Sequence, residues 1–385
     1  MNILIIPPND LINNEIPNRL YHLARHWQHH TLYLLRYPHY PTSTNIERPL
    51  RRIDIAPDAK PAGNPATYYL KNAKAIHQAL KRTLQREPID VIIHANILPS
   101  LYAVQLAKAY GKRAVFDYLD HYPESAAAYF KNKAAKWAVY TAVALITTYN
   151  LKNSHTIVTV SHTLKQLLER RAKKPIHLIP NGVDTELFKP MPKEQARRQL
   201  ALEEYSPILL YYGSITEWID YKALLWLTAR LKPKYPNILL LLVGKIYKKS
   251  EEEEIKATIK QLEIERNVKI IPTQPQEKIP TYIAAADIVY APYKNLRKNY
   301  TTPVKIFEAM ACERPIVAAE LEELKRWFKN YLLYYTDYTS LEEKTRNILE
   351  NYDAYMSNAA NARTYAQQFD WKNLAKTYET LLATT

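Results

Sequence analysis

The sequence predicts an α/β protein of two Rossmann-like domains that face each other across a cleft, with a long closing helix at the end. Three observations favour this fold class. A length of 385 residues exceeds one usual hydrophobic core. Strand-like apolar runs alternate with helix-like segments, which is typical of parallel sheets built from βαβ units. Three of the five glycines, Gly182, Gly213 and Gly244, each follow such a run. Glycine suits a backbone that turns at positive φ or approaches a ligand, and open α/β sheets bind ligands where their strands end.

The first half of the chain predicts one such domain, residues 1–188. Strands are expected at 2–6, 31–36, 90–94, 113–117, 156–160 and 176–179. Helices are expected between them at 16–29, 67–86, 99–110, 125–150 and 162–172. The prolines of segment 37–66 predict a long loop.

The second half repeats the pattern and predicts a second domain, residues 206–365. Strands are expected at 208–212, 238–243, 268–271, 287–290 and 315–318, and helices at 220–234, 250–264, 278–285, 303–312 and 320–328. The polar, proline-marked segment 186–206 is interpreted as an interdomain connection. Segment 340–383 is almost wholly helical in pattern, and we expect 366–385 to pack back on the first domain.

Composition limits the cellular setting and the chemistry. Cys312 is the single cysteine, so the sequence offers no disulfide framework or cysteine metal site, as expected in a reducing cytoplasm. The histidines lack ligand spacing, so no metal is expected. The segment Met1–Pro7 is interpreted as a first buried strand rather than a signal peptide. The apolar stretch Trp137–Tyr149 is too short to span a bilayer.

The net charge of +15 is unevenly distributed. Residues 1–190 carry 25 Lys and Arg against 13 Asp and Glu, whereas residues 191–385 carry 28 against 25. A basic first half indicates an anionic partner, either nucleic acid or membrane phosphate. Because nothing in the chain resembles a nucleic-acid reading module, we favour an anionic membrane surface and expect no nucleic-acid partner.

Three motifs stand in the order expected for a known family. They are Ile179-Pro-Asn-Gly-Val-Asp-Thr-Glu-Leu-Phe188, Ala284-Ala-Ala-Asp-Ile-Val-Tyr-Ala-Pro292, and Pro303-Val-Lys-Ile-Phe-Glu308 with its continuation to Ala318. The sequence resembles the nucleotide-sugar-dependent glycosyltransferases of family 4, and the resemblance covers most of residues 1–380. It implies the two-domain GT-B architecture, a nucleoside diphosphate sugar (UDP- or GDP-sugar) as substrate, no further cofactor, and retention of anomeric configuration.

The resemblance and the local chemistry place the donor in the second domain. A helix starting with a hydroxyl cap at Thr301-Thr302 and a proline in its first turn would direct free N–H groups at a diphosphate. In the family, a glutamate at the position of Glu308 holds the ribose hydroxyls, and Lys305 one turn earlier could neutralise phosphate. The expected donor-binding residues are Asn181, Gly182, Gly213, Ser214, Tyr300, Thr301, Thr302, Pro303, Lys305 and Glu308. Glu308 and Lys305 could instead be ordinary solvated helix residues.

The chain departs from the commoner family pattern at several positions. Ser214 and Ile219 stand where the pattern has an arginine and a lysine, and Tyr300 replaces its first glutamate. Glu313 and Arg314 stand where the family has a glycine before Pro315. We therefore expect fewer cations on the diphosphate. The run Gly213–Asp220 resembles a divergent branch of teichuronic-acid-type transferases.

Acidic and imidazole groups follow a strand of the first domain. Asp117, Asp120 and His121 stand where proton transfer or sugar positioning could occur. We expect Asp120 and His121 to be catalytic, and Arg19 and Asp117 to bind the acceptor. The alternatives are a helix N-cap by Asp120, a surface histidine, and a structural ion pair at Arg19.

The stretch Ala126–Tyr140 mixes lysines with Phe, Trp and Tyr at helical spacing. Such a helix either lies on a membrane or packs on its own domain. With the basic first half, it favours a lipid-linked or glycan acceptor and a cytoplasmic protein peripheral to the membrane. The alternatives are an epimerase or hydrolase of the same fold, a non-catalytic nucleotide-sugar-binding protein, and a basic nucleic-acid binder.

Overall fold

The computed structural model describes residues 1–14, 16–216, 218–294, 300 and 302–384. By internal contacts the chain divides into two compact units, which are described separately. Unit 1 comprises Met1–Asn181 with Trp371–Thr385, and unit 2 comprises Gly182–Asp370. The first part of unit 1 ends at Asn181, and the helix α16 (Trp371–Thr384) is its last segment.

Unit 1 contains, in its described part, a seven-stranded parallel sheet in the order β3-β2-β1-β4-β5-β6-β7. Its strands are β1 (Asn2–Ile6), β2 (Thr31–Leu35), β3 (Ile53–Ile55), β4 (Val91–His94), β5 (Arg113–Tyr118), β6 (Thr156–Thr159) and β7 (Ile176–Leu178). Leu4 of β1 is paired with Tyr33 on one side and with Ile92 on the other. The chain thus leaves β1 in one direction and returns on its other side, which creates a topological switch point.

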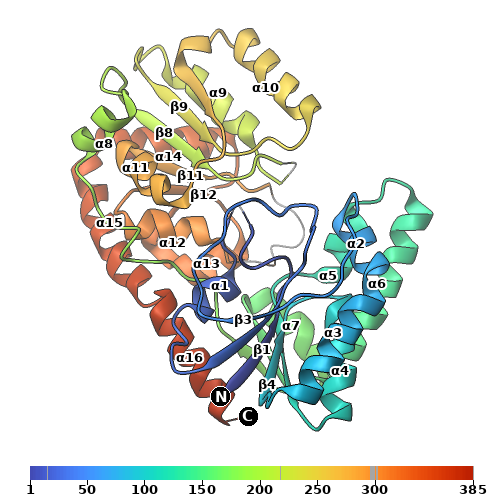
Figure 1. Cartoon of the computed structure of the whole chain (residues 1–385). Helices are drawn as coiled ribbons and strands as arrows, with labels where there is room; N and C mark the ends of the chain where they lie inside the picture. Colours follow the sequence, from blue (N-terminus) through green and yellow to red (C-terminus); the bar gives the residue numbers. More distant parts are fainter. Residues whose placement is uncertain (15, 217, 295–299, 301, 385) are drawn as a thin grey trace. The chain divides into compact units, whose positions relative to one another are not determined.

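Helices cover both faces of this sheet. They are α1 (Arg19–Ala24), α2 (Pro65–Lys71), α3 (Ala73–Arg86), α4 (Leu98–Ala109), α5 (Tyr122–Ala128), α6 (Lys133–Asn153), α7 (His162–Ala172) and α16. Figure 1 shows α3 and α4 on one side of the sheet and α1 and α16 on the other. The C-terminal helix is anchored by aromatic contacts: Trp371 stacks on His22 with ring centroids 5.0 Å apart, and Trp27 lies 5.5 Å from Tyr378.

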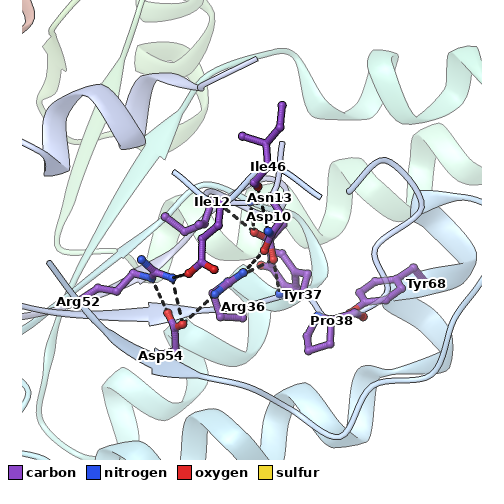
Figure 2. Close-up of polar contacts among 11 residues, drawn as sticks. Asp10, Ile12, Asn13, Arg36, Tyr37, Pro38, Ile46, Arg52, Asp54 and Tyr68 are labelled. Atoms are coloured by element: carbon purple, nitrogen blue, oxygen red, sulfur yellow. Dashed lines mark hydrogen bonds and ion pairs between the residues drawn. The ribbon is translucent and has the colours of Figure 1, made fainter. Parts of the chain in front are cut away.

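The segment 37–66 is not entirely a loop, because it contains β3 at the edge of the sheet. Charged pairs hold this edge, and Figure 2 shows them. Arg36 Nη1 lies 2.8 Å from Asp54, and Arg52 Nε lies 2.7 Å from the same carboxylate. Asp10, in the loop after β1, accepts hydrogen bonds from the backbone N–H of Asn13 and of Tyr37 and from Arg36 Nε. These contacts come from three separate loops. Because distant residues hold the three-residue strand β3 in place, its own sequence shows no alternation of apolar and polar residues that would predict it.

Unit 2 contains, within the described residues, a six-stranded parallel sheet in the order β10-β9-β8-β11-β12-β13. The strands are β8 (Ile208–Tyr212), β9 (Leu239–Val243), β10 (Val268–Ile271), β11 (Ile288–Ala291), β12 (Ile316–Ala319) and β13 (Leu333–Tyr335). Leu209 of β8 is paired with Leu240 on one side and with Ile288 on the other. The switch point of this unit therefore lies between β8 and β11.

The helices of unit 2 fall on the two faces of its sheet. They are α8 (Lys193–Leu200), α9 (Tyr221–Leu231), α10 (Lys249–Gln261), α11 (Ile279–Ala285), α12 (Val304–Ala311), α13 (Glu322–Phe328), α14 (Tyr338–Glu350) and α15 (Tyr352–Gln367), with short 3₁₀ turns at Glu265–Asn267, Gln276–Lys278 and Lys329–Tyr331. The α9 residue Leu224, the α10 residue Ile255 and the α14 residue Leu341 are fully buried in one core with the strands. Figure 1 shows α9 and α14 away from α12, with the strands between them.

Other elements also differ from the prediction. The expected connection 186–206 contains α8, which packs on α11 through Ala196, while Lys193 and Arg197 pair with Asp287 at 2.8 Å and 2.6 Å. The expected helix 125–150 is two helices, because Asn132 caps a new one by accepting from the N–H groups of residues 134 and 135. The short edge strand β13 was not predicted.

Candidate functional site

Two glycines shape the switch point of unit 2. Gly213 follows β8 with φ 123° and Gly244 follows β9 with φ 150°. A Cβ on Gly244 would lie 2.1 Å from the Gly213 carbonyl oxygen, so the two loops are in contact at these α-carbons. The Gly213 N–H donates to the Val243 carbonyl at 2.7 Å and holds the loop after β8 against the end of β9. Both glycines are thus required by backbone conformation and by close approach, as the sequence predicted.

The side chain of Lys305 crosses directly over Gly213. A Cβ built on Gly213 would lie 1.9 Å from Lys305 Cε and 2.7 Å from its Nζ. Lys305 comes from the first turn of α12, so the fold brings an ammonium group to the carboxyl end of β8. This is the position in an open α/β sheet at which ligands bind. Gly213 is therefore the residue that makes room for the lysine.

Tyr212 fixes α12 relative to β8. Its hydroxyl donates to the Lys305 carbonyl at 2.7 Å, and it also interacts with the Glu308 carboxylate. Gln276, in the turn after β10, hydrogen-bonds with the same carboxylate. The strand β8, the turn Gln276–Lys278 and the helix α12 thus meet at Glu308, although the sequence indicated neither Tyr212 nor Gln276. Tyr212 reads as one more apolar strand residue, and nothing around Gln276 forms a motif.

Glu308 is buried, with 7% of its surface exposed. Burial raises its carboxyl pKa from 4.5 to about 7, while Lys305 and the hydrogen bonds from Tyr212 and Gln276 act in the opposite direction. Burial lowers the pKa of Lys305, and the carboxylate of Glu308 opposes this shift. The structure therefore places a carboxyl group with a pKa near neutral pH and a lysine one helical turn apart. Neither is a solvated surface residue.

The start of α12 differs from the prediction. The helix begins at Val304, and Pro303 is its N-cap with φ −68° and ψ 119°, without a side-chain cap hydrogen bond. The expected hydroxyl cap followed by proline at the first helical position is therefore wrong. The extended ψ of Pro303 delays the helix by one residue. Thr302 is buried, Tyr300 is half-buried, and Thr301 lies outside the described residues.

The other predicted donor residues lie in loops. Ser214 directly follows Gly213, is half-buried, and its carbonyl accepts from the Tyr211 hydroxyl at 2.8 Å. Asn181 is the last residue of the first part of unit 1, and Gly182 opens unit 2. The structure thus gathers Gly213, Ser214, Lys305 and Glu308 in one unit.

In unit 1, Arg19 and Asp117 form a buried ion pair. Arg19 Nε lies 3.2 Å from the Asp117 carboxylate, and its Nη1 donates to the Pro180 carbonyl. Burial raises the pKa of Asp117 and Arg19 lowers it. The pair joins α1 to the carboxyl end of β5. Arg19 therefore forms the structural ion pair that was one of the alternatives for this residue. Acceptor binding by these two residues stays a prediction.

Asp120 and His121 lie at the loop between β5 and α5. The Asp120 carboxylate accepts from the His121 backbone N–H at 2.7 Å and from the Ser125 hydroxyl. His121 itself occupies the N-cap position of α5 and is buried, with Nδ1 3.2 Å from Glu124. The alternative of an Asp120 N-cap beside a surface histidine is therefore wrong. Catalysis by these residues stays a prediction.

Within the described residues, no group of three or more His, Cys, Asp and Glu side chains is placed to hold a metal ion. Every helix in that part of the chain is too short or too polar to cross a bilayer.

Comparison with known protein families supports the interpretation of both units. Residues 17–187 match the family described as Glycosyltransferase Family 4, and residues 192–368 match Glycosyl transferases group 1. The chain belongs to these glycosyltransferase families. The first match lies almost wholly in unit 1 and the second in unit 2.

Individual family members share modest identity with the chain. A D-inositol 3-phosphate glycosyltransferase from Segniliparus rotundus is 31% identical over 147 residues, which are 38% of this chain and 32% of the relative. A protein of Bacillus subtilis whose name assigns it to teichuronic acid biosynthesis, TuaH, is 27% identical over 176 residues, 45% of this chain and 41% of the relative. The matches thus span less than half the length of these two relatives.

Solved structures confirm the fold. Sucrose-phosphate synthase from Thermosynechococcus elongatus superposes with a TM-score of 0.81 at 19% identity over the whole of both chains. HepE of Anabaena in complex with UDP-glucose superposes with a TM-score of 0.74 at 16% identity, again over both whole chains. The chain therefore has the two Rossmann-like domains of the GT-B fold, as the sequence predicted.

Proposed function

We propose that this chain is a glycosyltransferase that moves a sugar from a nucleoside diphosphate donor to a hydroxyl group of an acceptor. One observation carries the proposal: Lys305 lies over Gly213 at the switch point of unit 2, with Glu308 buried one turn away. A cation above a positive-φ glycine at this place suits a diphosphate, because both the backbone and the ammonium group can approach phosphate oxygens.

Glu308 is the proposed partner of the donor ribose. A carboxylate provides two acceptor oxygens for a vicinal diol, and Tyr212 and Gln276 favour the ionised form of this carboxylate. Ionising the buried group is costly in the unliganded protein, since burial raises its pKa to about 7. Two ribose hydroxyls that donate to it would stabilise the ionised form.

Lys305 is the proposed stabiliser of the leaving group. When the bond between the sugar and the diphosphate breaks, negative charge develops on the phosphate oxygens, and a fixed ammonium group lowers the energy of that state. Lys305 is the cation that the geometry supplies, because Ser214 and Ile219 stand where the commoner family pattern has cations. Retention of configuration at the sugar is part of the proposal and follows from the family resemblance.

For the donor base we propose UDP first and GDP second. HepE of Anabaena, which shares the fold, was solved with UDP and with UDP-glucose. For the acceptor we propose a lipid-linked or cell-surface glycan precursor, supported by the basic first half of the chain. In unit 1, Asp120 and His121 are the groups proposed to take the acceptor proton.

The test is donor binding followed by donor consumption. We expect UDP or UDP-glucose to raise the melting temperature of the wild-type chain, since a ligand that binds only the native state stabilises it. Lys305→Gln should reduce affinity for the diphosphate by roughly tenfold or more, as expected for loss of a charge-assisted contact of about 1.5–3 kcal/mol. The matched control is Lys260→Gln, which removes an exposed lysine of α10.

The outcomes separate the proposal from its rivals. Consumption of donor that requires an acceptor supports transfer, whereas equal consumption without acceptor indicates a hydrolase or epimerase. Donor binding without any turnover indicates a non-catalytic nucleotide-sugar-binding protein. If Lys305→Gln and Glu308→Gln both bind and turn over donor like the wild type, the site is misassigned.

A further inference from the structure

Helix α6 of unit 1 and the short connection that leads into it from α5 expose large apolar side chains. Tyr129 is 77% exposed, Trp137 70% and Leu145 68%, and Phe130 and Tyr149 are more than one-third exposed. At 3.6 residues per turn, Trp137, Leu145 and Tyr149 fall within about one-third of the circumference of α6. We call these five residues the α6 face.

The opposite side of the helix is the one that packs on the protein. Val143, Thr147, Asn150 and Leu151 are buried, and α6 packs on α4 and α7 of its own unit. Packing against its own domain, one of the two alternatives for this stretch, therefore accounts for these buried residues. It leaves the α6 face without an explanation. Exposed large apolar side chains that gather on one part of a domain mark an interaction site.

Three lysines stand at the beginning of the same helix. Lys131, Lys133 and Lys136 are exposed, and the first turn of α6 holds no acidic residue. The partial positive charge of a helix N-terminus disfavours cations there, so these lysines oppose the stability of α6. Residues 125–168 contain no Asp or Glu, which leaves the positive charge of this surface uncompensated along the sequence. An anionic partner would relieve that repulsion.

We propose that the α6 face docks on a membrane surface that contains anionic lipids. Lysines beside exposed aromatic and aliphatic side chains match a headgroup layer, in which phosphates lie above the acyl chains. A second copy of the chain fits less well, because residues 125–168 contain no Asp or Glu with which the lysines of a copy could pair. Membrane docking through the α6 face would bring the chain to a lipid-linked acceptor, and this role rests on the proposed function.

The experiment is vesicle flotation with the full chain and no nucleotide sugar. We expect binding to phosphatidylcholine vesicles that contain about one-third phosphatidylglycerol, and little binding to phosphatidylcholine alone. Raising the salt concentration should weaken the binding, because the attraction of exposed lysines is screened.

Two variants and a matched control locate the contact. The triple variant Lys131→Gln, Lys133→Gln and Lys136→Gln should bind about 100-fold more weakly, roughly fivefold for each lysine lost near an anionic surface. The control Lys81→Gln, Arg82→Gln and Lys108→Gln removes the same charge from exposed positions of α3 and α4 and should bind like the wild type.

The second variant tests insertion of the apolar side chains. Trp137→Ser with Leu145→Ser keeps every lysine, and we expect weaker binding with loss of any blue shift of tryptophan fluorescence on vesicles.

Each other outcome overturns the proposal. Equal loss of binding in the lysine triple and its control would mean that net charge alone, and not this face, attracts the vesicles. No vesicle binding, together with a dimer that the Trp137→Ser and Leu145→Ser variant makes monomeric, would identify a second copy as the partner. UDP thermal shifts measured on each variant without vesicles keep this result separate from the donor-site test.

Discussion

Replacing Glu308 by glutamine should change how the stability of the chain depends on pH. The carboxyl pKa is about 7 in the folded protein against the ordinary 4.5, so the native state holds its proton more tightly than the unfolded state does. The stability contributed by this proton is complete below pH 4.5 and is lost as pH rises from 4.5 through 7. At about 1.4 kcal/mol per pH unit, the shift corresponds to a loss of about 3 kcal/mol.

Glutamine has the same shape but carries no ionisable proton. Relative to the wild type, Glu308→Gln should therefore gain about 2.5 kcal/mol of unfolding free energy between pH 5 and pH 8. Urea or thermal unfolding at pH 5, 6, 7 and 8 measures this difference. The control is Glu277→Gln, an exposed glutamate next to Gln276.

Donor nucleotide adds a second readout. If ribose hydroxyls donate to the ionised carboxylate, UDP should bind the wild type more tightly as pH rises through 7, and Glu308→Gln should lose both affinity and that pH dependence. Stability curves of wild type and variant that run parallel from pH 5 to pH 8 would refute the assignment of a buried, proton-retaining Glu308.

Three further substitutions test the packing of both units by urea unfolding at pH 7. Gly213→Ala should cost about 1–3 kcal/mol and weaken UDP binding, because its Cβ meets Lys305 at 1.9 Å and its φ is 123°. Gly244→Ala should cost more than Gly213→Ala, because its Cβ meets a backbone carbonyl at 2.1 Å that cannot swing away as a lysine can. Arg19→Met should cost about 3–5 kcal/mol, because it leaves Asp117 buried without its cation, and adding Asp117→Asn should restore part of that loss.

The controls for these substitutions come from the same chain. Gly63→Ala places a Cβ where no atom lies within 4 Å, so it should leave stability within about 0.5 kcal/mol of the wild type. If Gly213→Ala behaves like Gly63→Ala, Lys305 does not occupy the space above β8. If Arg19→Met behaves like an exposed arginine variant, the ion pair is not formed in solution.

Most strands of both sheets were predictable because they are apolar runs followed by a turn. The runs Ile208–Tyr212 and Leu239–Val243 match the predicted strands to within one residue. Elements held by contacts with distant parts of the chain were not predictable. The edge strand β3 depends on Arg36 and Arg52, and α8 depends on Asp287, which lies more than 80 residues later.

The candidate site divides in the same way. Gly213, Lys305 and Glu308 were predicted, since glycine scarcity and a family motif singled them out in the sequence. Tyr212 and Gln276 were not, because a tyrosine in a buried strand and a glutamine in a turn carry no signal until the fold places them against Glu308.

Residue order alone determined that this chain forms two parallel α/β domains, because apolar periodicity and turn residues are local properties that each segment carries by itself. It also determined which helix would bear the lysine and the glutamate. Only the tertiary structure decided that Lys305 lies over Gly213 and that Glu308 is buried enough to retain a proton near neutral pH. Proximity and desolvation arise from segments that meet in space, about 90 residues apart in this chain.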